Sequence, residues 1–85
     1  MKSSNSLKRR KVLATLVRKL NATVNGSAME LQDGITIENL LAQLEIDVRL
    51  VAVEQNLEIV PKADYSTRLI REGDAIEIVQ FVGGG

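Results

Sequence analysis

The chain has no cysteine and no histidine, and these two absences narrow its chemistry. Without cysteine it can form no disulfide, thiolate metal site or cysteine nucleophile. Without histidine it lacks the commonest general base and the commonest metal ligand of proteins. Carboxylates, hydroxyls, lysines and a single tyrosine remain. We therefore expect a protein that is not an enzyme and that holds no metal.

Long apolar runs are also missing. No run approaches the roughly 20 residues that span a bilayer, and the N-terminus lacks an apolar segment followed by the small-residue cleavage site of a secretory signal. Eighty-five residues suffice for one small domain. We expect a cytoplasmic protein that does not bind a membrane. The plastid stroma is the alternative if residues 1–18 belong to a targeting segment.

The charge is divided unevenly along the chain. Residues 1–19 carry seven bases and no acid, whereas residues 20–85 carry four bases and eleven acids. An acidic body disfavours nucleic acid as a partner, because binding to phosphates needs a basic surface. It suits a protein partner with a basic docking face. The basic run Arg9–Arg10–Lys11 keeps a nucleic-acid binder as a remote alternative.

Residues 1–18 are expected to form a basic N-terminal extension. Ser3–Ser6 is polar, and Val12, Leu13, Leu16 and Val17 then recur at helical spacing between bases. Short helices without packing are marginal in water, so we expect this extension to be flexible. Residues 19–85 are expected to form the domain itself.

The domain begins with a predicted hairpin. Residues 19–24 alternate between apolar and polar side chains, which is the period of a half-buried strand. Asn25–Gly26 predicts a tight turn, because both central positions of a type I′ turn need positive φ. The return strand spans residues 28–32 and turns Met29 and Leu31 inward.

A helix is predicted next. Thr36 is a good N-cap, and Glu38 favours the positive end of the helix dipole. Ile35 and Leu40 have the spacing of a hydrophobic staple. One apolar face is formed by Ile37, Leu40, Leu41 and Leu44.

Three further segments complete the pattern. The apolar run 50–53 predicts a covered strand, and a shorter strand with Leu57 and Ile59 ends at Pro61, which belongs at a sheet edge. Residues 62–69 form a surface connection in which Tyr65 and Leu69 are the expected core anchors. The final strand spans residues 75–82 and turns Glu77 outward.

This order of elements predicts an α+β domain with a β-grasp (ubiquitin-like) mixed sheet, covered on one face by a helix. The last strand should lie parallel beside the first, through a crossover that contains the helix. The expected core consists of Leu20, Ala22, Val24, Leu31, Ile37, Leu40, Leu41, Leu44, Val51, Val53, Leu57, Ile59, Ile76 and Ile78.

Three glycines, Gly83–Gly85, follow the last predicted strand. Glycine has no Cβ, so such a tail enters a slot that is too narrow for other residues. Three extended residues reach roughly 10 Å beyond the folded body. We therefore expect a flexible arm that presents a C-terminal carboxylate to the active site of another protein.

Taken together, the motifs of residues 19–85 resemble the ThiS family, the sulfur carrier proteins of thiamine biosynthesis. Their order and spacing carry the resemblance more than any single motif does. The motifs are Val24-Asn25-Gly26, Asp33-Gly34-Ile35-Thr36, Leu40-Leu41 with Leu44, Val51-Ala52-Val53-Glu54, Glu58-Ile59-Val60-Pro61, Glu72-Gly73-Asp74, Ile76-Glu77-Ile78-Val79 and the final Gly84-Gly85.

The resemblance implies a carrier chemistry at Gly85, with Gly83 and Gly84 as the flexible tail. An activating adenylyltransferase would use ATP and Mg to adenylate the Gly85 carboxylate. Sulfur from a cysteine desulfurase would then give a thiocarboxylate, and thiazole synthase would take up that sulfur. No cofactor bound to this chain is implied. The chain also lacks the phosphate-cradling GxxxxGK[ST] pattern, so it depends on another protein for activation.

Val79 and Phe81 share the outward parity of Glu77, and with Val82 they form the candidate partner interface. Exposed apolar side chains beside a tail often mark a partner site. Two other functions stay open at this point. The chain could carry sulfur for molybdopterin or another pathway, or it could be a ubiquitin-like protein modifier.

Overall fold

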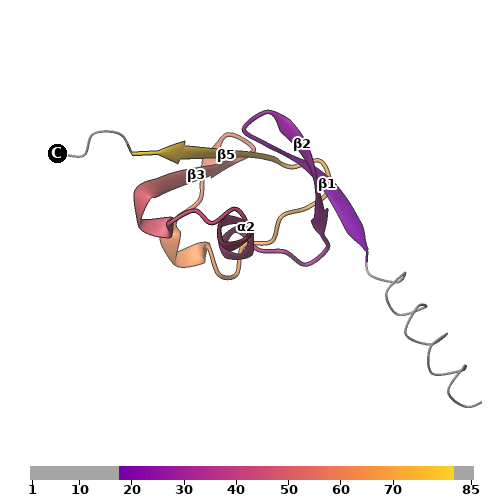
Figure 1. Ribbon diagram of the computed structural model, residues 1–85, viewed down its shortest axis with the longest axis horizontal. Helices are drawn as coiled ribbons and strands as arrows, with labels where there is room; N and C mark the ends of the chain where they lie inside the picture. Colours follow the sequence, from indigo (N-terminus) through magenta and orange to yellow (C-terminus); the bar gives the residue numbers. More distant parts are fainter. Residues whose placement is uncertain (1–17, 82–85) are drawn as a thin grey trace, which may run out of the picture.

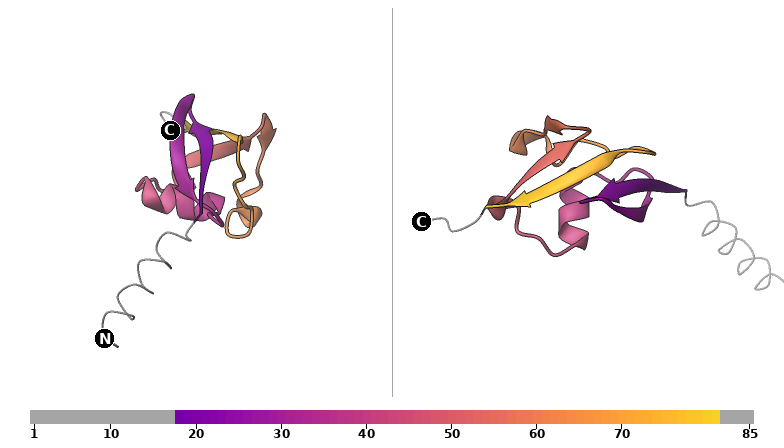
Figure 2. Two further views of the ribbon diagram at one scale, coloured as in Figure 1. Left: turned by 90° about the vertical axis from the view of Figure 1, so that its right-hand side faces the viewer. Right: turned by 90° about the horizontal axis from the view of Figure 1, so that it is seen from above.

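The computed structural model of the protein describes residues 18–81. It has a five-stranded mixed sheet in the order β2-β1-β5-β3-β4, and the helix α2 (Ile37–Gln43) lies across one face (Figures 1 and 2). The strands are β1 (Lys19–Val24), β2 (Ser27–Gln32), β3 (Val51–Gln55), β4 (Glu58–Ile59) and β5 (Ala75–Gln80). Because β5 pairs with β1 in parallel, the predicted β-grasp arrangement is confirmed. The predicted extension, apart from Arg18, and the predicted tail lie outside the described residues.

The β1–β2 hairpin follows the sequence prediction. Asn25 and Gly26 have φ values of +50° and +82°, as a type I′ turn requires. Asn25 also has a role that the sequence did not predict. Its side-chain Oδ1 accepts a hydrogen bond from the Ile78 N–H at 2.7 Å, and its Nδ2 donates to the Ile78 carbonyl at 3.3 Å. The amide group thereby extends the short parallel pairing of β1 with β5 by one position.

The helix α2 begins at the predicted N-cap. Thr36 Oγ1 accepts from the Asn39 N–H at 3.1 Å, and Asn39 Oδ1 accepts from the Thr36 N–H at 3.2 Å. These two bonds make a capping box, which satisfies backbone donors at the helix start. Ile37, Leu40 and Leu41 are fully buried, so the apolar face lies against the sheet.

The core is largely the predicted one, but two of its expected members are wrong. Leu57 and Ile59 are 87% and 74% exposed. Leu57 lies in the β3–β4 turn with φ +70°, and Ile59 pairs with the outward-facing Glu54. Successive strand residues face opposite sides, so Val60 enters the core in place of Ile59.

The connection after β4 places its apolar residues differently from the prediction. Tyr65 is buried as expected, whereas Leu69 is 40% exposed and is not a core anchor. Leu69 forms an isolated bridge with Thr36, and the Ile70 N–H donates to the Ile35 carbonyl at 3.0 Å. In this extended segment the side chain of Ile70 therefore enters the core while that of Leu69 faces outward. Leu44 and Ile78 are only partly buried against the core.

No helix within residues 18–81 is long and apolar enough to cross a membrane.

Removal of residues 1–17 is expected to leave the fold intact. The buried core begins at Leu20, and Arg18 contributes its backbone carbonyl, which accepts from the Asp33 N–H at 2.9 Å. We expect a change in unfolding free energy within about 0.5 kcal/mol, as for a surface change that touches none of the core. Dispersed amide resonances of the truncated protein would support this prediction, and a collapsed spectrum would contradict it.

Candidate functional site

Strand β5 runs from the core to the point where the tail begins. It pairs antiparallel with the whole length of β3, from Gln55↔Ile76 to Val51↔Gln80. The Phe81 N–H then donates to the Leu50 carbonyl at 2.8 Å. The chain is thus tied to the sheet as far as Phe81. The predicted carrier residue Gly85, with Val82, Gly83 and Gly84, lies outside the described residues.

The two sides of β5 differ in character. Ile76 is buried and Ile78 is partly buried on the side of α2, whereas Val79 and Phe81 are 51% and 56% exposed on the other side. The outward parity predicted for these two residues is therefore correct. We call the uncovered side of β3, β4 and β5, with Phe81 at its end, the open face. It is formed by Ala52, Glu54, Ile59, Glu77, Val79 and Phe81.

One further residue reaches this face from outside the sheet. Lys62, at the start of the 3₁₀ turn Lys62–Asp64, places its Nζ 5.4 Å from the centroid of the Phe81 ring. A cation over an aromatic face at this distance is a favourable contact. The sequence did not predict this role of Lys62, because no local pattern connects Lys62 with Phe81, which lies 19 residues later in the chain.

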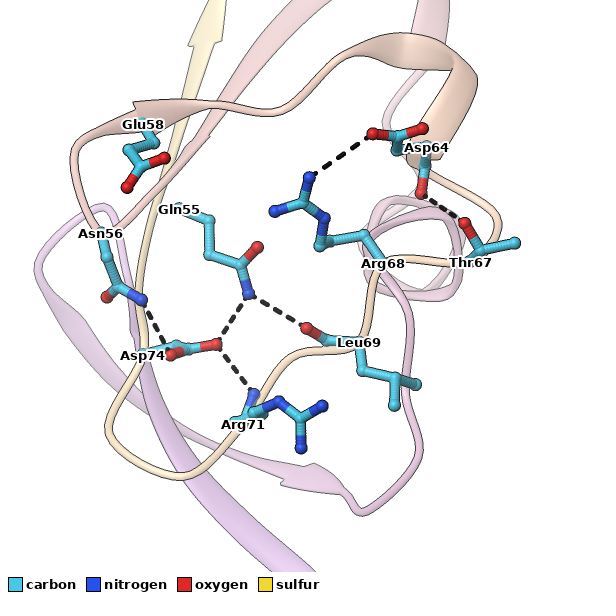
Figure 3. Close-up of a pocket in the computed structure, with 9 residues that line it drawn as sticks. All are labelled: Gln55, Asn56, Glu58, Asp64, Thr67, Arg68, Leu69, Arg71 and Asp74. Atoms are coloured by element: carbon cyan, nitrogen blue, oxygen red, sulfur yellow. Dashed lines mark hydrogen bonds and ion pairs between the residues drawn. The ribbon is translucent and has the colours of Figure 1, made fainter.

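A group of polar side chains, which we call the polar brace, joins the β3–β4 hairpin to the segment that leads into β5 (Figure 3). The Asp74 carboxylate accepts from Gln55 Nε2 at 2.7 Å, from Asn56 Nδ2 at 2.9 Å and from the Arg71 N–H at 2.8 Å. Gln55 Nε2 also donates to the Leu69 carbonyl at 3.0 Å. These bonds tie the hairpin turn to the segment that leads into β5, beside an open cavity of about 630 Å³.

The brace also sets the ionisation of Asp74. Burial alone would raise the pKa of Asp74, but the hydrogen bonds from Asn56, Arg71 and Gln55 outweigh it and lower the pKa. Gln55 Oε1 is buried without a hydrogen-bond partner among the described residues. Within residues 18–81, no group of three Asp, Glu, His or Cys side chains could hold a metal ion. The hydrogen bonds of the brace hold the β3–β4 hairpin in position against the segment that leads into β5.

Asp74→Asn is expected to destabilise the protein by about 1–2 kcal/mol at neutral pH, because an amide donor would face the donors of Gln55 and Asn56. The native carboxylate has a lowered pKa. Its contribution is therefore present above the unfolded pKa of about 3.9 and is lost as the pH falls through the folded pKa. Urea unfolding at pH 7 and pH 3 should show that the difference in unfolding free energy between the native protein and Asp74→Asn becomes smaller as the pH falls.

A second carboxylate, that of Asp47, also has a lowered pKa and is present in both proteins. The side-chain hydrogen bond from Arg49 is the main cause that lowers the pKa of Asp47 to about 2. This group is unchanged in the variant, so its effect cancels in the comparison. An equal loss of stability at both pH values would contradict the role given to the Asp74 carboxylate.

The fold and the open face together define a ubiquitin-like domain with a β-grasp sheet. It offers an uncovered sheet side with exposed apolar residues, beside the strand that leads to the end of the chain. Its outward side chains there are apolar or acidic, and Lys62 reaches the face from outside the sheet.

Comparisons with known proteins identify the family. The family model of the ThiS family matches residues 11–85. The sulfur carrier protein ThiS of Bacillus subtilis is 44% identical over 54 residues, which cover 64% of this chain and 82% of that protein. The solved structure of the thiamine biosynthesis protein ThiS from Geobacter metallireducens has 33% identity and a TM-score of 0.66, and the match covers 78% of this chain and all of that one. The chain belongs to the ThiS family.

A segment of a larger protein is also similar. A thiazole synthase of Paramagnetospirillum magneticum is 46% identical over 66 residues, which cover 78% of this chain and 20% of the synthase. The chain thus spans about a fifth of the length of that relative. The family match starts at residue 11, ahead of the boundary that the sequence pattern placed at Lys19.

Proposed function

We propose that this chain is a sulfur carrier of thiamine biosynthesis and that the carboxylate of Gly85 carries the sulfur. The observation that supports this proposal is membership of the ThiS family over a match that extends to residue 85. Relatives in Bacillus subtilis and Escherichia coli that bear the name of sulfur carrier are matched over 82% and 92% of their length. In this proposal the chain is a substrate of other enzymes.

The chemistry begins from an unreactive group. A carboxylate at neutral pH is ionised and is a poor electrophile. An oxygen of the Gly85 carboxylate attacks the α-phosphorus of ATP and pyrophosphate leaves. Sulfur at the level of hydrosulfide then adds to the acyl carbon, and AMP leaves with the former carboxylate oxygen. The product is a thiocarboxylate in which one sulfur has replaced one oxygen.

Each further component belongs to a partner. An activating adenylyltransferase binds ATP and Mg. A cysteine desulfurase supplies the sulfur as a persulfide, a thiol reductant brings it to the level of hydrosulfide, and thiazole synthase receives it. The synthases of Paramagnetospirillum magneticum and Magnetococcus marinus each contain a segment similar to this chain, at 46% and 39% identity. In those proteins a ThiS-like segment and a synthase share one polypeptide, which supports thiazole synthase as a partner.

Docking of these enzymes is assigned to Val79, Phe81 and Val82. The exposure of Val79 and Phe81 beside the tail supports this assignment, since exposed apolar clusters mark protein interaction sites. Gly83–Gly85 would then extend from the docked body as the flexible tail. Residues 1–18 are taken as an extension outside the carrier domain. The proposal locates the chain in the cytoplasm, or in the plastid stroma if residues 1–18 are part of a targeting segment.

The mass of the protein provides the test. The purified chain is incubated with its activating adenylyltransferase, Mg-ATP and sulfide, and we expect the gain in mass that corresponds to sulfur replacing oxygen. Addition of thiazole synthase together with its other substrates, which accept the sulfur, should return the original mass. An unchanged mass at the first step would refute the carrier assignment. Isopeptide conjugates on denaturing gels would favour the protein modifier instead.

A further inference from the structure

On the uncovered side of the sheet, some acidic residues form an ion pair and others do not. On the β1–β2 half, Glu30 has a cation, because Lys19 Nζ lies 3.7 Å from its carboxylate. On the open face, Glu54 and Glu77 form no ion pair with any residue of the described range 18–81. Glu54 and Glu77 are also direct cross-strand partners on β3 and β5.

This pairing is unfavourable in the isolated protein. Cβ atoms of direct cross-strand partners lie about 4.5–5.5 Å apart, and like charges in such a pair destabilise a sheet. Apolar side chains surround the pair, because Ile59 is the β4 partner of Glu54, and Ala52 and Val79 form the next pair along β3 and β5. Two carboxylates without a cation in an exposed apolar surface indicate that the matching positive charge comes from a partner.

The face is also polarised along β5. The two carboxylates lie near its middle, and Lys62 covers Phe81 at the end beside the tail. Glu77 and Phe81 are four residues apart, which is roughly 13 Å along a strand. A partner with one cation is therefore attracted to the carboxylates and repelled from Lys62. This polarity would fix the direction in which the tail enters the partner.

We propose that Glu54 and Glu77 are the specificity-determining pair of the open face and that they receive an arginine guanidinium of the activating adenylyltransferase. The inference rests on the proposed function. A guanidinium is planar, offers five donors and is weakly hydrated, so one group can bond two carboxylates among apolar side chains. The apolar residues around the pair would exclude water from the contact and strengthen it.

The test uses Glu54→Gln, Glu77→Gln and the double variant, with Glu30→Gln as the matched control on the other half of the sheet. The measured quantities are kcat/KM for adenylation by the chain's own activating adenylyltransferase and the thermal midpoint. Each open-face variant should lower kcat/KM about tenfold or more, since a buried charge would lose its partner. The same variants should leave the midpoint unchanged or raise it by about 1–4 °C, since the repulsion is relieved.

Three further results are expected from the control, the double variant and added salt. Glu30→Gln should react as fast as the native chain, which separates a local contact from an effect of net charge. The double variant should lose less than the product of the single losses, because one guanidinium serves both carboxylates. The native rate should fall with added salt more steeply than the rates of the variants.

Failure of the inference and failure of the proposed function can be told apart. If the native chain is adenylated and the open-face variants react equally fast, the carboxylate pair has no role and only the inference falls. If the variants lose rate together with a clearly lower thermal midpoint, the pair is structural and the inference also falls. If the native chain is not adenylated at all, the proposed function falls, and the inference with it.

Discussion

An alanine appended after Gly85 is expected to abolish thiocarboxylate formation, with a rate loss of about a hundredfold or more. The added residue moves the terminal carboxylate by one backbone step, roughly 3.5 Å. A displacement of about 1 Å already costs on the order of a hundredfold in a reaction between positioned groups. The measurement is the intact mass after incubation with activating adenylyltransferase, Mg-ATP and sulfide.

The triple glycine supplies a control that few tails allow. Deletion of Gly85 leaves a chain that ends in Gly83–Gly84, so the terminal chemistry is kept and the reach is shortened by one residue. We expect this chain to fold normally and to stay unmodified. If it gains sulfur as fast as the full chain, reach is not the criterion and Gly85 is not the unique carrier residue.

The fold was predictable where the signals are local. Asn25–Gly26 fixes the first hairpin because few residues accept positive φ at both turn positions. Thr36 starts the helix because its side chain satisfies an amide three residues ahead. In both cases the determining contact lies within a few residues, so a single sequence is enough to indicate it.

The short strand β4 shows where a local pattern fails. Leu57 and Ile59 have the spacing of an inward-facing pair, but the turn at Asn56–Leu57 shifts the facing by one residue. Ile59 then faces outward beside Glu54, and Val60 is buried. A two-residue strand carries too little periodicity to set its own register, so the hairpin turn sets it.

In the candidate site, too, the features that depend on neighbouring residues could be predicted, and those that join distant segments could not. The outward parity of Val79 and Phe81 follows from alternation within one strand. The Lys62 contact, the Asp74 brace and the Glu54–Glu77 pair all join segments that are distant in sequence. No spacing rule connects them, because they depend on the register of β3 against β5 and on the path of the connection between β4 and β5.

Phe81→Ala is expected to weaken docking of the activating adenylyltransferase by about 30-fold, the cost of removing an aromatic residue at an interface hot spot. The ring is 56% exposed in the free protein, so its loss should change stability much less than removal of a core side chain. The contact with Lys62 would be lost too, at a cost of about 0.5–1 kcal/mol. Affinity is measured by calorimetry and stability by urea unfolding.

Leu57→Ala is the matched control for this prediction. Leu57 is another large apolar residue with an exposed side chain, at 87%, but it lies in the β3–β4 turn and is not part of the open face. The Leu57→Ala variant should bind the activating adenylyltransferase as tightly as the native chain does, because docking depends on the open face and not on the total apolar surface of the protein. Equal affinity losses in both variants would contradict a specific site at Phe81. An undiminished affinity of Phe81→Ala would remove this residue from the interface and leave the docking of the tail to be sought on another side of the domain.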